Sequence, residues 1–589
     1  MNSLSVDTEF PRGLLRPELF LGVACAVTAR TVGVNLSEAS RPTGSHFSGD
    51  RYGRGEVGEF VLIEGQQSLL LGRIAEIHLR EQERRSLKRN LASSSDFDAL
   101  GNIQLLGCVA MNDLSVTAGV DAYPRLGDRI YAAPHRFIAL LPRLMEFQQD
   151  KSQSVTLNLG TIGSSHDSAV YIKPERLFGR HCAILGATGG GKSWTTARII
   201  EECINHDAKL ILLDATGEYC DFAGSNVDHC HLGNPVNAAS DSVASSLPPT
   251  SFLESDFVAL FEPAGKVQGP KLRAAMRTLR LAELKPELAS AGIIMKIDQS
   301  KAAIEAAEKI SEIARVLDDP RQPFDARMLV RQIEQECVYP EGFKAGGRRG
   351  EKDPTIWGGE DGNFSHCLSL VARINGVLTS PAFASVFDAD ALPALTSSID
   401  EFAASKKTLL RIDLSGVAFE YRAREIIANV IGRHLLTKAR GGAFQAKPTV
   451  VMVDEAHNFL GRHIGTEDYA AKLDAFELIA KEGRKYGLNV CLASQRPRDL
   501  TESVLSQIGT LIVHRLTNDR DREVVERASG EIDRAASAFL PNLRPGEAAI
   551  IGTDFPIPLT IRVIAPATKP KSAGPNYQKY WGTSAAEES

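Results

Sequence analysis

The sequence lacks the features that mark several protein classes. Its nine cysteines include no CxxC pair, which favours reduced thiols in a cytoplasmic protein over a disulfide framework. No run of about 18 apolar residues is present, and the polar N-terminus has no signal-peptide core, so we expect no membrane span. The formal net charge of −6 excludes a broadly basic surface, and a nucleic-acid contact must therefore come from a local patch or a pore lining.

The remaining composition is that of an ordinary globular protein. Hydrophobic residues make up 43% and charged residues 24% of the chain. A length of 589 residues is too great for one hydrophobic core, so we expect two or three domains.

One stretch of eight residues, GATGGGKS from Gly186 to Ser193, carries the strongest signal. It fits the phosphate-binding loop, in which glycines let backbone N–H groups face a triphosphate. Lys192 then reaches the β- and γ-phosphates, and the Ser193 hydroxyl binds Mg²⁺. The apolar run 182–185 predicts a buried strand before the loop, and 194–200 predicts a helix after it, whose dipole adds to the site. The predicted nucleotide-binding residues are Gly186, Thr188, Gly189, Gly190, Gly191, Lys192, Ser193 and Trp194.

A second candidate element is an apolar strand, 450–453, that ends in Asp454 and Glu455. Asp454 can hold Mg²⁺, and Glu455 can polarise the attacking water. Many buried strands end in acids, so the pair predicts nucleotide hydrolysis only in combination with the phosphate loop upstream.

Two further polar residues follow predicted strands. Asp214 ends the apolar run 209–213, at the edge where open α/β sheets bind ligands. It can act on the metal or the water, or it can be a plain turn residue. Gln495 follows the run 488–493 and can sense the γ-phosphate.

Arginine is the remaining requirement, because an arginine, often from a neighbouring subunit, stabilises charge on the transferred phosphoryl group. Arg484 and Arg180 are the candidates, and either can also be a plain surface charge. The mixed-charge run 80–89 favours a solvated helical face over a DNA contact.

The pattern along the chain predicts an α/β fold with a helical insertion. Short apolar runs broken by turn residues predict a small β-barrel in residues 1–150. Strand–loop–helix–strand patterns predict two parts of one nucleotide-binding core, in 151–240 and 401–565. Residues 241–400 are predicted to be mainly helical. The polar residues 566–589 are predicted to form a flexible tail or an arm that contacts a neighbouring subunit.

Four segments, in this order, resemble the HerA family of hexameric DNA translocases, which are relatives of FtsK: GATGGGKS, DATGEY, VVMVDEAHNFL and EGRKYGLNVCLASQRP. Residues 177–181 are also similar to that family, and the β-rich N-terminal region would correspond to its HAS barrel. The resemblance covers residues 10–565 and is that of a bacterial member.

The resemblance implies a RecA-like P-loop core that binds ATP and Mg²⁺ through Lys192 and Ser193. It implies that Asp214, Asp454 and Glu455 form an acidic catalytic set and that Gln495 is the sensor. It also implies that Arg484 is an arginine finger supplied by a neighbouring subunit, and that Arg180 is a second trans-acting arginine. It also implies a homohexamer with double-stranded DNA in its central channel. The implied partner docks on the barrel and is a nuclease such as NurA, or a sirtuin-like NADase or another nuclease in anti-phage defence.

Other functions stay open. The chain could form an ATP-switched scaffold that regulates a defence effector with little translocation, which the net negative charge favours. Residues 454–457 also spell DEAH, the box of a different helicase superfamily, but that box follows its phosphate loop much more closely in those proteins. An ATPase that acts on a bound protein, independently of DNA, is a further alternative.

Overall fold

The structure is a computed structural model and describes residues 13–37, 45–47, 50–53, 55–79, 99–145, 155–162, 168–319, 321–344, 350–388, 391–460, 462–464, 471–529, 534–572 and 577. The chain forms two compact units, which we call unit 1 (Met1–His206 with Cys491–Lys569) and unit 2 (Asp207–Val490 with Pro570–Ser589). The division of the chain into five segments at 1–150, 151–240, 241–400, 401–565 and 566–589 remains a prediction from the sequence. The mixed-charge run 80–89 lies outside the described residues.

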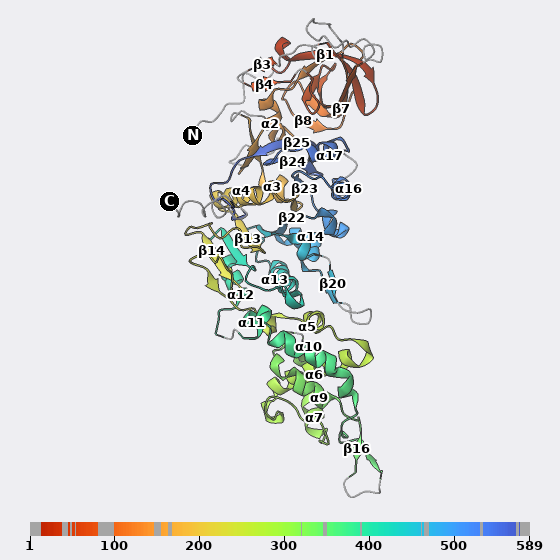
Figure 1. Ribbon diagram of the computed structural model, residues 1–589, viewed down its shortest axis with the longest axis vertical. Helices are drawn as coiled ribbons and strands as arrows, with labels where there is room; N and C mark the ends of the chain where they lie inside the picture. Colours follow the sequence, from red (N-terminus) through yellow and green to blue (C-terminus); the bar gives the residue numbers. More distant parts are fainter. Residues whose placement is uncertain are drawn as a thin grey trace, which may run out of the picture. The chain divides into compact units, whose positions relative to one another are not determined.

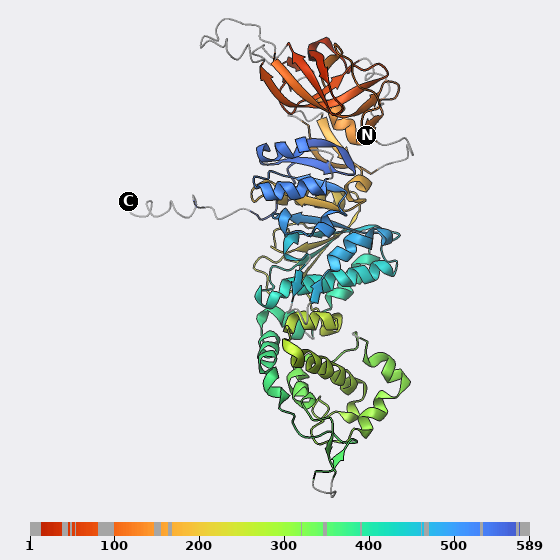
Figure 2. The same ribbon diagram turned by 90° about the vertical axis from the view of Figure 1, so that its right-hand side faces the viewer.

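Unit 1 begins with a closed antiparallel barrel, drawn in red and orange in Figures 1 and 2. The strands of its sheet are β1 Phe20–Val27, β2 Thr31–Leu36, β5 Phe60–Ile63, β6 Ser68–Leu79, β7 Ala99–Ala110, β8 Val116–Ala118 and β9 Arg129–Ala132. A separate short pair consists of β3 Ser45–Phe47 and β4 Asp50–Tyr52. The order is β2-β1-β9-β5-β6-β7, and pairing of β2 with β7 closes the ring. Alternate residues face inward, so Val32, Val34 and Leu36 are buried in the barrel core.

The rest of unit 1 is an α/β layer. Its strands are β10 Leu157–Thr161, β11 Ala169–Ile172, β12 Cys182–Leu185, β22 Leu488–Ser494, β23 Thr510–Val513, β24 Glu547–Gly552 and β25 Phe555–Val563. Its helices are α2 His135–Leu144, α3 Pro174–Phe178, α4 Lys192–Asn205, α15 Glu502–Leu505, α16 Asp519–Ala528 and α17 Arg534–Phe539. The strand order is β11-β10-β25-β24-β23-β12-β22, in which β12 runs parallel to β22 and β23 and the other pairs are antiparallel.

Unit 2 contains a second set of parallel strands. They are β13 Lys209–Asp214, β14 Val227–His231, β15 Val243–Ala244, β18 Leu409–Asp413 and β19 Thr449–Val453, in the order β19-β13-β18-β14-β15. Helices α13 Ala423–Arg440 and α14 Ala475–Glu482 follow β18 and β19 in the chain. Helix α14 begins at Ala475, after β20 Arg462–Ile464 and β21 Ala471–Leu473, which pair with each other as antiparallel strands.

The inserted part of unit 2 is mainly helical, as its helical spacing predicts, and is drawn in green in Figure 2. It contains α5 Glu254–Phe261, α6 Gly265–Leu284, α7 Ala302–Glu308, α8 Ser311–Leu317, α9 Leu329–Glu336, α10 Leu368–Leu378, α11 Ala384–Phe387 and α12 Leu395–Ala404, with the short strands β16 Gly342–Phe343 and β17 Lys352–Asp353. No single helix in the described ranges is long and apolar enough to cross a membrane. One bent pair, Asn363–Leu378 with Pro381–Phe387, meets those criteria jointly, with a bend of 64°.

The predicted fold class, an α/β core preceded by a small barrel, is confirmed. Of the predicted tail, residues 566–572 and 577 are described. Within unit 2, the Lys571 N–H donates a hydrogen bond to the Glu218 carbonyl, and Lys571 Nζ lies 2.8 Å from Asp221 Oδ1.

Candidate functional site

The predicted phosphate loop joins β12 to α4 in unit 1. Gly189 and Gly191 have φ values of 77° and 113°, in the left-handed region that glycine adopts without strain. Gly191 caps α4, so the first N–H groups of the helix and its dipole face the loop. Lys192 is only 6% exposed, which is rare for lysine. This backbone and its buried cation fit the binding of a triphosphate.

Gln495 lies beside this loop, also in unit 1. Because β12 and β22 run parallel with Leu185 opposite Ser494, the segments that follow them start at the same edge. Thr188 Oγ1 donates a hydrogen bond to Gln495 Oε1 at 2.5 Å. The structure thus brings the predicted sensor to the predicted loop.

Asp454 and Glu455 lie in unit 2, directly after β19. Asp454 is 1% exposed and accepts a hydrogen bond from Thr216 Oγ1 at 3.3 Å. Glu455 has a φ of 47°, a strained value for a glutamate and one that concentrates at functional sites. His457 Nδ1 lies 3.3 Å from Glu455 Oε2. A buried carboxylate followed by a glutamate in a fixed, strained turn suits metal binding and water activation.

Asp214 is the last residue of β13 in the same unit, and its side chain is fully buried. Its carboxylate accepts hydrogen bonds from the N–H groups of Gly217 at 2.7 Å and Tyr219 at 3.1 Å. It also accepts one from Arg411 Nε at 2.7 Å. These contacts favour the plain turn interpretation of Asp214, because they direct its oxygens to its own loop and to a cation of the protein.

Arg411 is a residue that the sequence reasoning missed. It lies in the middle of β18 and bridges Asp214 and Asp413, and none of the three side chains is exposed. Burial lowers the pKa of its guanidinium and the two carboxylates raise it, and the net shift is upward. The signal was an arginine in the apolar run 409–414, where an unpaired charge could not be buried.

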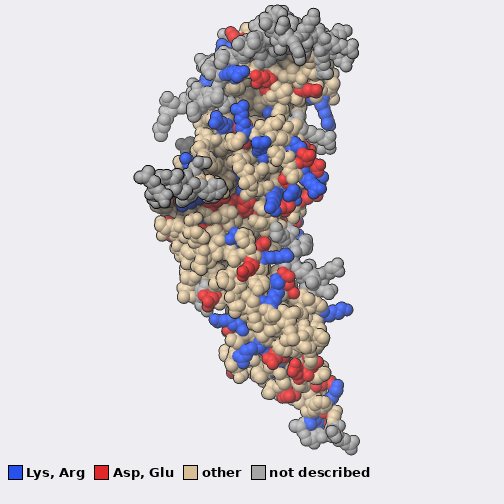
Figure 3. Space-filling view, in the orientation of Figure 1, with Lys and Arg blue, Asp and Glu red and all other residues tan. Residues whose placement is uncertain are grey.

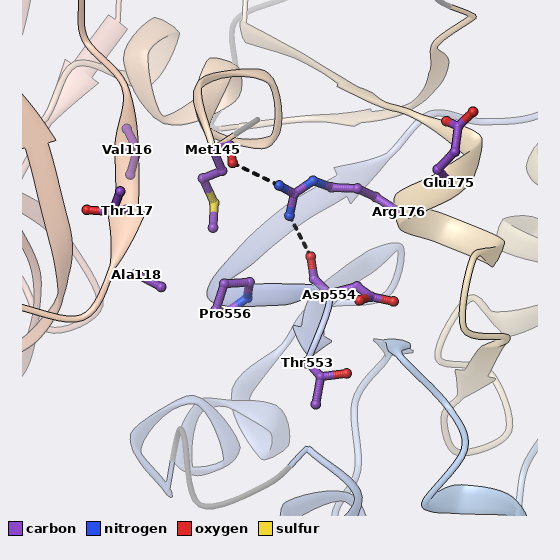
Figure 4. Close-up of a pocket in the computed structure, with 9 residues that line it drawn as sticks. All are labelled: Val116, Thr117, Ala118, Met145, Glu175, Arg176, Thr553, Asp554 and Pro556. Carbon is purple, nitrogen blue, oxygen red and sulfur yellow. Dashed lines mark hydrogen bonds between the residues drawn. The ribbon is translucent and has the colours of Figure 1, made fainter. Parts of the chain in front are cut away.

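Arg180 follows α3 in unit 1 and is 54% exposed, with its Nε 3.5 Å from Asp554 Oδ1. Its neighbour Arg176 donates hydrogen bonds to the carbonyls of Asp554 at 2.7 Å and Met145 at 3.0 Å. Figure 4 shows these bonds beside a pocket of about 420 Å³ between α3, β8 and the turn from β24 to β25. Arg176 therefore fixes Asp554, against which Arg180 lies at the surface.

Arg484 lies in unit 2, in the short 3-10 helix Gly483–Tyr486 after α14, and is exposed. Its guanidinium forms no hydrogen bond or ion pair with another residue in the described part of the chain. An arginine held at the surface without such a contact can reach a second subunit.

The charge of the surface is mixed. On the face drawn in Figure 3, basic and acidic side chains are interspersed. Together with the net charge of −6, this fits a nucleic-acid contact made by local groups rather than by a broad basic field.

The described residues contain no group of three or more His, Cys, Asp or Glu side chains that could hold a metal ion. Mg²⁺ does not require one, because it keeps several waters and takes one or two carboxylates with phosphate oxygens. Ser193 in the first turn of α4 and the buried Asp454 after β19 are donors of this kind. Taken singly, the Ser193 hydroxyl in unit 1 and the Asp454 carboxylate in unit 2 are each of the chemical kind that Mg²⁺ binds.

His514, which follows β23, is a second residue that the sequence reasoning missed. It is fully buried against the phosphate loop, and its Nε2 lies 2.8 Å from Thr195 Oγ1 in α4. No sequence motif marked it, because its contacts join distant segments.

A family model described as "Helicase HerA, central domain" matches residues 157–339. The chain is 24% identical over 417 residues to a "Probable DNA double-strand break repair helicase HerA" of Methanocaldococcus jannaschii, covering 69% of this chain and 76% of that one. It is 25% identical over 433 residues to a "DNA double-strand break repair helicase HerA" of Sulfolobus acidocaldarius, covering 72% of each. A Pyrococcus furiosus protein of the same name is 37% identical over 118 residues, 20% of this chain and 21% of that one.

Two solved structures are similar at low identity. A bacterial conjugative coupling protein, TrwB, is 14% identical with a TM-score of 0.41, covering 74% of this chain and 92% of its own. VirB4 of Thermoanaerobacter pseudethanolicus is 15% identical with a TM-score of 0.42, covering 71% of this chain and 98% of its own.

Proposed function

We propose that this chain, which belongs to the HerA family and is an ATPase, is a motor that moves double-stranded DNA by hydrolysing ATP. The observation that carries the proposal is the phosphate loop, with left-handed glycines and a buried Lys192, in a chain that matches the HerA central domain. The names of its relatives as DNA double-strand break repair helicases support DNA as the track.

The phosphate loop binds the nucleotide. Its backbone N–H groups and the start of α4 hold the phosphate oxygens, and Lys192 pairs with the β- and γ-phosphates. Ser193 and Asp454 hold Mg²⁺, which when bound neutralises charge that develops on the phosphate oxygens.

Glu455 orients and polarises the attacking water, and its strained turn fixes where the carboxylate points. Gln495 senses the γ-phosphate, and its hydrogen bond to Thr188 ties the sensor to the loop. Asp214 contributes by holding the turn from which Thr216 reaches Asp454.

Six copies of the chain form the ring that encloses DNA. Arg484 of one subunit acts on the nucleotide of the next, which its exposure and lack of a described partner support. A trans-acting arginine of this kind contributes about 10³–10⁵ to turnover in phosphoryl-transfer enzymes. Arg180 is the second arginine at the interface, oriented by Asp554.

The motor works with a separately encoded effector that docks on the N-terminal barrel. The effector is a nuclease such as NurA in DNA end processing, or a sirtuin-like NADase or another nuclease in anti-phage defence. We place this activity in the cytoplasm, since none of the nine cysteines, all of them described, forms a disulfide.

Displacement of a roadblock tests translocation directly. Linear double-stranded DNA with streptavidin bound near one end is incubated with protein and ATP, and release of streptavidin is followed over time. We expect release by the wild-type protein and none by Lys192→Ala. ATP hydrolysis without release would refute translocation and support the alternative, an ATP-switched scaffold for a defence effector, which the net charge of −6 favours.

A further inference from the structure

We propose that His514 is a positioning residue for the phosphate loop. Its packing and hydrogen bonds keep the loop in the conformation that binds nucleotide. The proposal rests on the binding of ATP at this loop. His514 follows β23, lies entirely within unit 1 and belongs to no part of the site predicted from the sequence.

The side chain of His514 packs directly against three loop glycines. A Cβ added at Gly186 would lie 2.6 Å from His514 Cβ, and one at Gly190 would lie 3.3 Å from the same atom. A Cβ added at Gly191 would lie 3.2 Å from His514 Cε1. Gly186 and Gly190 do not have positive φ values. Gly186 therefore needs to be glycine because of His514, and Gly190 because of the Ala187 carbonyl oxygen, 3.0 Å from an added Cβ, together with His514.

The hydrogen bonds of the ring set its tautomer. His514 Nδ1 lies 2.9 Å from the Glu547 carbonyl oxygen, which can only accept, so Nδ1 carries the proton. Burial lowers the pKa of His514 to about 4, so the ring is neutral near neutral pH. Nε2 therefore accepts a hydrogen bond from Thr195 Oγ1 at 2.8 Å.

These contacts join the loop and the start of α4 to β24, the strand that pairs with β23. Thr195 lies in the first turn of α4 after Lys192, and Glu547 begins β24. Next to it, the Gly546 N–H donates a hydrogen bond to the Gly190 carbonyl at 3.3 Å. A loop fixed in this way before the nucleotide arrives loses less conformational entropy on binding.

A matched pair of substitutions in α4 tests the proposal. Thr195→Val keeps the shape of the side chain and removes the hydroxyl that His514 accepts from. Thr196→Val makes the same change at the next residue, which is equally buried and whose hydroxyl has no partner among the described residues. Thr195→Ser keeps the hydroxyl and serves as the conservative rescue.

Three quantities are measured on the full chain. They are the dissociation constant of a fluorescent ATP analogue, the hydrogen-exchange rate of the amides in residues 186–191 without nucleotide, and the thermal unfolding midpoint. Thr195→Val should weaken binding about fivefold, the worth of one net hydrogen bond, and should speed exchange in the loop. Thr196→Val and Thr195→Ser should match the wild type in nucleotide binding and in loop exchange.

The outcomes separate this proposal from its premise. Failure of the wild type to bind the analogue would refute ATP binding at the loop. If the wild type binds and Thr195→Val matches Thr196→Val in binding and loop exchange, the positioning role is refuted. A lower unfolding midpoint of Thr195→Val with unchanged binding and exchange would assign the His514–Thr195 contact to stability alone, and would also overturn the proposal.

Discussion

Replacing Arg411 with methionine should strongly destabilise unit 2. Its guanidinium lies 2.7 Å from Asp214 Oδ2 and 2.8 Å from Asp413 Oδ2, and all three side chains are 0% exposed. Methionine fills similar space but leaves two buried carboxylates without a cation. Because breaking a buried ion pair from one side costs about 3–5 kcal/mol, we expect a loss of that size in the free energy of unfolding at neutral pH.

The assay is urea unfolding followed by far-ultraviolet circular dichroism. Arg527→Met serves as the control, since its pair with Glu523 spans 3.9 Å with side chains 71% and 62% exposed. An exposed pair contributes about 0–1 kcal/mol, so this variant should unfold close to the wild type. If Arg411→Met unfolds within about 0.5 kcal/mol of Arg527→Met, the buried triad does not hold the ends of β13 and β18 together, and the reasoning is refuted.

Four further predictions follow from the site and the barrel. Lys192→Ala should abolish ATP turnover while the circular dichroism spectrum stays unchanged, and hydrolysis at the wild-type rate would contradict the assignment of the loop. Arg484→Ala should bind nucleotide but lose turnover by about 10³-fold or more. Mixing it with Glu455→Gln subunits should restore some turnover, and no recovery in any mixed ring would argue against a finger supplied in trans. Thr188→Val removes the hydrogen bond to Gln495 and should lower the turnover rate about fivefold in steady-state assays, whereas an unchanged rate would separate the sensor from the loop. Burial raises the pKa of Glu59 in the barrel from 4.5 to about 7, so the folded chain binds more protons than the unfolded chain between these values and loses stability as pH rises through them. Glu59→Gln should remove this loss, up to about 3 kcal/mol above pH 7 in urea unfolding, and the same pH slope in both proteins would contradict the burial argument.

Much of the nucleotide-binding core could be predicted from local pattern. The apolar run 182–185 coincides with β12 and the apolar run 450–453 lies within β19, because strands buried on both faces are continuous apolar segments. The phosphate loop was recognisable for a different reason, since its glycines are required by its own backbone and by close packing.

Residues whose partners are distant in sequence could not be predicted. His514 and Thr195 are separated by 319 positions, and Arg411 and Asp214 by 197. Nothing in the neighbouring sequence distinguishes His514 or Arg411 from an ordinary histidine or arginine. Only the folded sheet brings each of them to its partner. The contact of His514 with the Glu547 carbonyl in β24 was missed for the same reason, because 33 positions separate the two residues.

The exact start of a helix could not be predicted either, because it depends on backbone geometry that the apolar spacing of the sequence does not reveal. Helix α13 begins only at Ala423, because the two residues before it, Tyr421 and Arg422, have φ values of 50° and 57°. Two left-handed residues in succession cannot continue a right-handed helix. The apolar spacing of the sequence gives no sign of this turn.

The most direct test of the central claim is ATP hydrolysis by the purified chain with and without double-stranded DNA, with mass photometry of the same sample. A DNA-driven motor predicts a species of ring mass whose turnover rises when DNA is added. A ring whose turnover is indifferent to DNA would contradict the translocase and favour the ATP-switched scaffold.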